Sequence, residues 1–437
     1  MLTNPVFLSV IIMVGLSLAK LNVLLSLIIA ALAGGLLAGM PLGETMSTLI
    51  DGMGGNSSTA LSYILLGALA ATLHKTGIAV ILTRKLVTIV KDKTVVLLLA
   101  IAAVASLSQN LIPVHIAFIP ILIPPLLVVM DRLRMDRRAV ATALTFGLKA
   151  PYVALPLGFG WIFHGIISDQ MTENGLAISQ GEVWQVMWIA GAAMVVGLLV
   201  AVFFTYRTPR DYEEREPAGT DGPPEGAVEE RMTRKHWVAL LGALAALAVQ
   251  VSPIGSLHIG AILGIAIIIA GGALRWSDLD EMLHSGIGMM GFIAFVMLVA
   301  AGYGAVLRET GAIAPLVETA DAMFGGSRLL GATMMIVIGL FITMGLGTSF
   351  GTIPIIAAIY VPMAMSLGFS TPATILLIGT AAALGDAGSP ASDSTLGPTA
   401  GLNADGQHDH IWDTCVPTFL HYNIPLMVVG IIGAVVL

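Results

Sequence analysis

The chain has 437 residues, of which 57% are hydrophobic and only 11% are charged, with a formal net charge of -7. A soluble domain has about 25% charged residues, so this composition excludes a soluble globular protein and indicates a polytopic protein whose main partner is the lipid bilayer, not a nucleic acid. The single cysteine, Cys415, excludes an internal disulfide and a metal cluster built from cysteines.

Apolar runs long enough to span a bilayer follow one another along the chain. We interpret the first, residues 5–19, as a membrane helix and not as a signal peptide, because no Lys or Arg precedes Lys20 and no small-residue cleavage site follows. Further single spans are predicted at 21–40, 57–73, 184–206, 237–252, 257–274, 286–307 and 416–437.

Six other segments are apolar but irregular. Polar, Gly or Pro residues break some of them in the middle, and two others are predicted to be amphipathic surface helices. We expect helical hairpins, re-entrant or fully spanning, at 94–130 and 328–367, interrupted helices at 139–167 and 372–397, and surface helices at 76–92 and 311–327.

The basic residues indicate the orientation of the chain. Most of the 20 Lys and Arg residues fall in the segments 75–93, 132–138 and 207–235. Cytoplasmic loops carry an excess of Lys and Arg, so we expect these segments in the cytoplasm and the N-terminus outside. The protein is then a multi-pass protein of a bacterial inner membrane.

Residues 207–235 form the one long polar segment. They are rich in Pro, Gly, Glu and Arg and show no apolar periodicity, which is typical of a disordered linker. We therefore predict an N-terminal membrane half at 1–206, a cytoplasmic linker at 207–235 and a C-terminal membrane half at 236–437.

The two halves align without gaps at an offset of 234 residues. Gly77 then corresponds to Gly311, and Pro156 corresponds to Pro390. Each half, with its hairpin counted as two crossings, crosses the membrane an odd number of times, so the second copy is inverted. Inverted repeats with broken helices are typical of secondary transporters, whose binding sites lie at the midplane between the repeats.

Two carboxylates, Asp386 and Asp393, lie in the polar stretch 385–397, directly after the apolar run 372–384. A charged Asp near the centre of a spanning helix costs about 2.5–3.5 kcal/mol and marks an ion or proton pathway by default. We predict that at least one of the two binds a cation, such as Na⁺, or carries a proton. The alternative is a structural role, in which they pair with Lys149 or cap half-helices.

Neutral oxygens accompany these carboxylates. Hydroxyl side chains stand beside them and at the glycine-rich break of the second hairpin, residues 345–352, where glycines permit close backbone approach. Hydroxyl oxygens suit a small hard cation, although Ser and Thr also bond helix carbonyls and small residues also pack membrane helices. The predicted neutral ligands are Ser389, Ser392, Thr395, Thr348, Ser349 and Thr352.

The first half contributes three further candidates. Asn110 and His115 stand at the break of the first hairpin, and His115 is either a proton carrier, a contact for an organic substrate or a satisfied buried histidine. Lys149 precedes a helix break, and its repeat counterpart is Ala383, one turn before Asp386. It is either a charge partner of an aspartate or a partner of a substrate carboxylate, with snorkelling as the structural alternative.

The motif Gly385-Asp386-x-x-Ser389-Pro390-x-Ser392-Asp393-Ser394-Thr395 resembles the signature of the NhaC-type Na⁺/H⁺ antiporter family, and 347–352 resembles the hairpin motif of that family. The resemblance implies the ion transporter superfamily fold, a homodimer with an elevator-like moving domain, and an ion site at Asp386, Ser389, Asp393, Thr348, Ser349 and Thr352. The tail 399–410 is similar to a YuiF-like branch, whose members are suspected of moving amino acids such as histidine.

Two functions follow from these patterns. The first is a secondary Na⁺/H⁺ antiporter, in which Asp386 and Asp393 bind the two cations in alternation. The second is a Na⁺- or H⁺-coupled amino-acid symporter, in which Asn110, His115 and Lys149 face the solute. We expect no enzyme and no cofactor, because no nucleophile–base motif or phosphate-binding loop occurs, and we expect His408 and His410 to be solvated and not to bind a metal.

Overall fold

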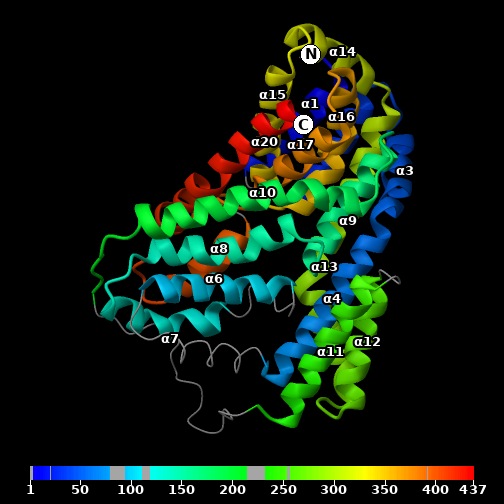
Figure 1. Cartoon of the computed structure of the whole chain (residues 1–437). Coiled ribbons are helices and arrows are strands. Elements are labelled where there is room, and N and C mark those ends of the chain that lie inside the picture. Colours follow the sequence, from blue (N-terminus) through cyan, green and yellow to red (C-terminus); the bar gives the residue numbers. More distant parts are fainter. Residues whose placement is uncertain are drawn as a thin grey trace.

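The computed structural model describes residues 3–19, 21–78, 94–110, 119–213, 232–252, 256–390 and 392–437. Within these ranges nearly all residues are helical and no β-strand occurs (Figure 1). The predicted fold class, an all-α polytopic membrane protein, is confirmed.

The helices of the first half, followed by those of the second, have the following bounds. The first half contains α1 (Pro5–Leu18), α2 (Val23–Leu37), α3 (Leu42–Gly52), α4 (Ser57–Thr76), α6 (Thr94–Asn110), α7 (Ile119–Arg132), α8 (Arg137–Ala154), α9 (Phe159–Glu173) and α10 (Gln180–Val200). The second half contains α11 (Arg234–Val251), α12 (Leu257–Ala270), α13 (Leu279–Glu309), α14 (Ile313–Phe324), α15 (Arg328–Leu346), α16 (Ser349–Ser366), α17 (Thr371–Ala383), α18 (Asp393–Leu402), α19 (Val416–Thr418) and α20 (Ile424–Val436).

Six continuous helical runs in the described ranges are long and apolar enough to cross a membrane. The pair α8 and α9, bent by 46° at its break, adds a seventh if it is counted as one broken span and not as a re-entrant loop. The six runs are Leu42–Leu73, Gln180–Thr205, Met290–Glu309, Arg328–Leu346, Ser349–Ser366 and His410–Val436.

Two features differ from the sequence-based expectation, and a third expectation falls mostly outside the described residues. Helix α3 was not expected. Its polar residues, such as Glu44 and Thr45, interrupt the apolar pattern, so the sequence did not indicate that the helical run containing α4 begins at Leu42. Short π-helical segments at Ala201–Thr205, His410–Cys415 and Phe419–Asn423 were not expected either. The predicted surface helix at 76–92 lies mostly outside the described residues.

The predicted helix breaks are present, and local chemistry explains them. Helix α15 ends at Gly347, whose φ of 69° is left-handed and favours glycine. Helix α17 begins after Ser370, whose side chain accepts a hydrogen bond from the amide of Ala373. Helix α18 begins after Ser392, which caps the amide of Ser394 in the same way. The described residues between α17 and α18, 384–390 and 392, therefore form no regular helix, and most of them are buried.

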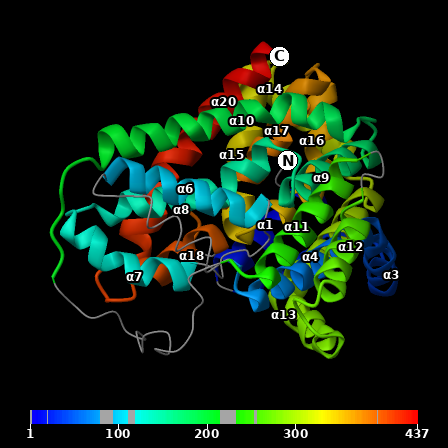
Figure 2. The same ribbon diagram turned by 60° about the horizontal axis from the view of Figure 1, so that its bottom comes forward.

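Helices that are distant in sequence pack side by side. Helix α4 packs against α12 and α13, and α8 packs against α6 and α18 (Figures 1 and 2). Each of these groups draws helices from both halves of the chain, as interlocked repeats would. The inverted symmetry and the domain boundaries stay predictions.

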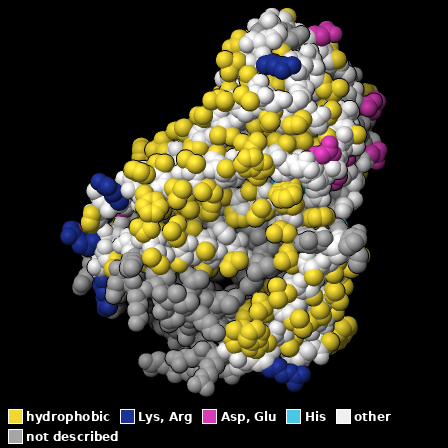
Figure 3. Space-filling model, in the orientation of Figure 1, with side chains coloured by type: hydrophobic (Ala, Val, Ile, Leu, Met, Phe, Trp, Pro, Cys, Tyr) yellow, Lys and Arg dark blue, Asp and Glu magenta, His cyan; other side chains and the backbone are white. Residues whose placement is uncertain are grey.

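The surface supports a membrane orientation. Hydrophobic side chains cover much of the face shown in Figure 3, while most visible Lys and Arg side chains lie along its left and lower edges and the acidic ones lie along the upper right. The exposed hydrophobic residues include Trp184, Trp188 and Phe204. This segregation agrees with the positive-inside rule, and the outside position of the N-terminus stays a prediction.

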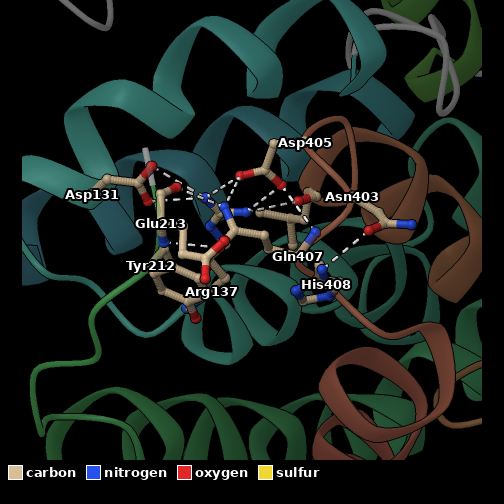
Figure 4. Close-up of polar contacts among 9 residues, drawn as sticks. Asp131, Arg137, Tyr212, Glu213, Asn403, Asp405, Gln407 and His408 are labelled. Atoms are coloured by element: carbon tan, nitrogen blue, oxygen red, sulfur yellow. Dashed lines mark hydrogen bonds and ion pairs between the residues drawn. The ribbon is translucent and has the colours of Figure 1, made fainter. Parts of the chain in front are cut away.

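A buried ionic network around Arg137 lies at the α7–α8 turn (Figure 4). We call this end of the molecule, where Lys and Arg residues gather, the basic end. The guanidinium of Arg137 is fully buried and donates to both carboxylate oxygens of Asp405 at 2.7 Å and to Asp131 at 2.9 Å. Tyr212 packs its ring against the same guanidinium, at 4.2 Å from the centroid, and its hydroxyl accepts from the Arg137 amide at 3.0 Å. Residues at the start of the predicted linker thus bind the α7–α8 turn.

The network also buries a histidine that we expected to be solvated. His408 is 2% exposed, its Nε2 lies 2.7 Å from the hydroxyl of Thr414, and its amide donates to Asn403 at 3.0 Å. Burial lowers the pKa of His408 to about 4. The expectation was wrong because the start of the linker and the loop 403–409 fold over one another, which the local sequence does not reveal.

Candidate functional site

Asp386 lies in the break between α17 and α18 and is almost completely buried. Its Oδ1 accepts a hydrogen bond from the Ser349 amide at 3.2 Å. Its Oδ2 accepts from the hydroxyls of Ser349 and Tyr152, which are themselves 3.1 Å apart. Three donors therefore stabilise one buried carboxylate, as such a charge requires.

Three separate elements build this cluster. Ser349 is the first residue of α16, so its free amide points out of the helix N-terminus toward the carboxylate. Tyr152 belongs to the last turn of α8 in the first half of the chain. The cluster therefore joins the second hairpin and the two interrupted helices at one carboxylate.

Lys149 does not pair with an aspartate. Its fully buried ammonium donates to the main-chain carbonyl of Ala383, the last residue of α17. A cation suits this position because the last carbonyls of a helix have no intrahelical donor and carry partial negative charge. We expected a Lys–Asp pair as one alternative, but the oxygens of Asp386 are already taken by Ser349 and Tyr152.

Both contacts join positions that the repeat alignment equates. Lys149 and Ala383 are 234 residues apart, and so are Tyr152 and Asp386. Such contacts are expected where equivalent positions lie near a symmetry axis, and the inverted orientation of the second copy stays a prediction.

A cavity of about 150 Å³ adjoins Asp386. Residues from α4, α8, α9, α13, the hairpin break and the start of α18 surround it. Its lining includes Tyr63, Tyr152, Phe159, Phe292, Phe350, Thr348, Asp386, Ser392, Asp393 and Ser394. The lining thus combines several aromatic rings with two carboxylates.

The aromatic residues of the lining pack as a cluster around Phe350. The centroid of the Phe350 ring lies 5.2 Å from that of Tyr152 and 5.6 Å from that of Tyr63. The ring centroids of Tyr63 and Phe159 are 5.9 Å apart. Within the described part of the chain, the buried hydroxyl of Tyr63 has no hydrogen-bond partner. A buried unpaired hydroxyl is costly, and here it belongs to a residue that lines the cavity, where a ligand or water can satisfy it.

The remaining predicted ligands divide into two groups. Thr348, Ser392 and Asp393 line the cavity beside Asp386, and Asp393 is exposed to it as the first residue of α18. The other hydroxyls donate to main-chain carbonyls instead. These are Thr352 to Thr348 at 2.9 Å, Ser389 to Met344 at 3.2 Å, and Thr395 to Ser389 at 2.5 Å.

Two sequence candidates cannot be placed in the site. His115 lies outside the described residues, as does the side chain of Asn110, although the backbone of Asn110 ends α6. Sequence reasoning in turn missed the aromatic residues Tyr63, Tyr152 and Phe350. Only Tyr152 had a signal in the sequence, because it is the repeat counterpart of Asp386.

Comparison with known proteins places this arrangement among transporters. The Na⁺/H⁺ antiporter family matches residues 143–431, and a second Na⁺-H⁺ antiporter family matches residues 4–90. An "uncharacterized membrane protein" of Vibrio parahaemolyticus is 47% identical, with 99% of this chain and 100% of that protein covered. The "Putative amino acid transporter YuiF" of Bacillus subtilis is also 47% identical, with the same coverage of 99% and 100%.

Two solved structures share the fold. The YdaH transporter of Alcanivorax borkumensis has a TM-score of 0.63 at 15% identity, with 90% of this chain and 87% of that chain covered. MtrF of Neisseria gonorrhoeae, described among antimetabolite efflux pumps, has a TM-score of 0.63 at 16% identity, with 91% and 85% covered. At these identities the likeness concerns the fold alone.

Proposed function

This chain belongs to the Na⁺/H⁺ antiporter family of membrane transporters, and from that premise we propose that it is an ion-coupled carrier of a small amino acid. The observation that carries the proposal is the cavity beside Asp386, whose lining combines aromatic rings with the carboxylates of Asp386 and Asp393. The name of YuiF, a 47% identical relative, supports the same solute class.

The size and lining of the cavity favour an organic solute over a bare metal ion. A cavity of about 150 Å³ in another protein is large enough for benzene. Aromatic faces attract organic ammonium groups through cation–π contacts, whereas hard metal cations select oxygen ligands. The rings of Tyr63, Phe159 and Phe350 are therefore better explained by an amino acid than by Na⁺ alone.

The two aspartates take different roles in this proposal. Asp393, which is exposed to the cavity, binds the ammonium of the solute. The unpaired hydroxyl of Tyr63 donates a hydrogen bond to the carboxylate of the solute. Asp386, already enclosed by hydroxyls, binds the coupling proton or Na⁺. Lys149 holds the end of α17 in place and does not contact the solute.

Protonation of Asp386 provides a direct means of coupling. An ionised carboxylate only accepts hydrogen bonds, but a protonated one has become a donor at one oxygen. If the proton occupies Oδ2, this oxygen can no longer accept from both Tyr152 and Ser349. Since these residues belong to α8 and α16, the ionic state of one group changes the contact between an interrupted helix and the hairpin.

Na⁺/H⁺ antiport without an organic solute is the second candidate. The family match favours it, and so do the hydroxyls of Ser349 and Tyr152 on Asp386. Thr348 adds a further hydroxyl to the lining of the cavity. In that case Na⁺ and H⁺ compete for Asp386, and the cavity holds water that hydrates the ion.

Transport by purified protein in proteoliposomes separates the two candidates. Uptake of a radiolabelled mixture of the standard amino acids is measured under an imposed pH gradient and under an imposed Na⁺ gradient. A pH dye in the same vesicles reports proton movement after NaCl is added without amino acids. We expect gradient-driven amino-acid uptake, which Asp393→Asn reduces at least tenfold.

The matched control is Asp51→Asn, which neutralises an exposed aspartate on α3 and should transport like the unmodified protein. Na⁺-driven proton movement with no amino-acid uptake would overturn the proposal and establish antiport.

A further inference from the structure

A second cavity lies beside the first, on the neighbouring faces of α4 and α9. Its volume is about 240 Å³. Ser62 lines this second cavity whereas Tyr63, the next residue, lines the first, and on α9 Trp161 lines the second whereas Phe159 lines the first. Thr59 of the second cavity lies about one helical turn before Tyr63, and Ile162 lies about one turn after Phe159, so the two cavities lie at successive turns of α4 and α9.

The second cavity lies away from the basic end of the molecule. Helix α8 begins at Arg137, within the ionic network, and ends at the break, and α9 continues from the break to Glu173. Asp169, near the end of α9, lines the second cavity. The ionic network and this cavity therefore lie at opposite ends of one broken span, with the first cavity near the break.

The lining of the second cavity offers one partner for each charge of a zwitterion. Asp169 supplies a carboxylate, and neither Lys nor Arg is among the lining residues, all of which are described. Helix α12 begins in the lining at Leu257 after its capping residue Ser256. The first amides of a helix lack intrahelical acceptors and attract anions, so a solute carboxylate fits there.

His258 in this lining connects α12 to α4. Its Nε2 lies 2.8 Å from the carbonyl oxygen of Ser58 and 3.0 Å from the hydroxyl of Ser62. Since a carbonyl only accepts, Nε2 carries a hydrogen. The imidazole thus fixes the start of α12 against α4.

We propose that this second cavity is an entry site, where the amino acid binds before it passes the contact between Tyr63 and Phe159 into the first cavity. Asp169 holds the ammonium, and the start of α12 holds the carboxylate. In this proposal the two rings, whose centroids are 5.9 Å apart, separate the second site from the first. The inference rests on the proposed function, because it takes the same solute class.

Equilibrium binding to the purified full chain tests the entry site apart from transport. The probe is the radiolabelled mixture of the standard amino acids, and the quantity measured is the number of molecules bound per chain at saturation. We expect two for the unmodified protein, one for Asp169→Asn and one for Asp393→Asn. Asp51→Asn should retain both.

A second variant, which fills the cavity and leaves Asp169 in place, tests the proposal in case Asp169→Asn misfolds locally. Gly165 lines the second cavity, and a Cβ there would have ordinary contact with Gln180 at 3.8 Å, so Gly165→Leu fills the space without a backbone clash. We expect it to bind one molecule and to raise the KM of uptake at least tenfold with a smaller change in maximal rate. Gly43→Leu, where nothing lies within 4 Å, is the control.

The outcomes separate the two proposals. One molecule bound by the unmodified protein, with no change in Asp169→Asn and Gly165→Leu, overturns the entry site and leaves the proposed function standing. No amino acid bound by the unmodified protein overturns the proposed function, and the entry site with it.

Discussion

Neutralisation of Asp405 should destabilise the protein far more than neutralisation of Asp131, although both carboxylates bind Arg137. The side chain of Asp405 is 1% exposed, that of Asp131 is 24% exposed, and Arg137 itself is 0% exposed. Removal of one partner from a buried ion pair costs about 3–5 kcal/mol. Because Asp131 still faces the guanidinium in Asp405→Asn, we expect a loss of about 3 kcal/mol, at the lower end of that range.

The matched variant Asp131→Asn should lose about 1 kcal/mol or less, since water screens a partly exposed pair. The assay is unfolding in detergent, with the free energy of unfolding measured for both variants and the unmodified protein. An equal loss in the two variants, or a larger loss in Asp131→Asn, would refute the reasoning.

The ion pair of Asp405 and Arg137 also predicts how the stability of the protein depends on pH. Burial would raise the pKa of Asp405, but its hydrogen bonds and charge contact with Arg137 outweigh burial and hold the pKa below its usual value. The stabilisation is therefore present above pH about 4, the ordinary pKa of Asp, and is lost as the pH falls through the lower native value. The difference in the free energy of unfolding between Asp405→Asn and the unmodified protein should be constant from neutral pH to about pH 5. It should become smaller below about pH 4.

Two further predictions concern stability. The pKa of His408 is about 4 in the folded protein, so the free energy of unfolding should decrease as the pH falls from about 6.5 toward 4, at up to about 1.4 kcal/mol per pH unit. In His408→Gln this decrease should be smaller. An unchanged dependence of the unfolding free energy on pH would contradict the buried, low-pKa state of His408. Gly197→Ala should cost about 1–3 kcal/mol or more, because a Cβ there would lie 1.8 Å from the carbonyl oxygen of His421; Gly181→Ala on the same helix meets only Ser179 at 3.8 Å and should leave the unfolding midpoint unchanged, and equal midpoints in the two variants would exclude this close approach of α10 to the carbonyl.

The helix breaks and the buried carboxylate could be predicted because their signals are local. Gly347 marks the end of α15, since its left-handed backbone favours glycine. Asp386 stands out because a charge within an apolar run requires compensation. In both cases the relevant physics acts within a few residues of the chain.

The partners of that carboxylate could not be predicted in the same way. Tyr152 reaches Asp386 from 234 residues away, and an aromatic residue in an apolar helix gives no sign of whether it faces lipid or a cavity. Tyr63 and Phe350 meet only after α4 and α16 have packed. Tertiary packing, and not local pattern, decides which rings line the site.

The partner of Lys149 shows the limit of pairing arguments. The repeat alignment places Lys149 at the position of Ala383, one turn before Asp386, which made an ion pair with an aspartate one alternative, yet the ammonium binds the carbonyl of Ala383. The unpaired carbonyls at the end of α17 compete for the cation, and hydroxyls compete for the carboxylate. A sequence argument that counts charges alone omits both competitors.

The most direct test of the account is a comparison of driven accumulation and simple exchange in Asp386→Asn. Both are measured with the radiolabelled amino-acid mixture in proteoliposomes, first under an imposed ion gradient and then with unlabelled amino acids inside and no gradient. If Asp386 binds the coupling ion while Asp393 and the aromatic rings bind the solute, the variant should lose accumulation and retain exchange. Accumulation at the level of the unmodified protein would contradict the account.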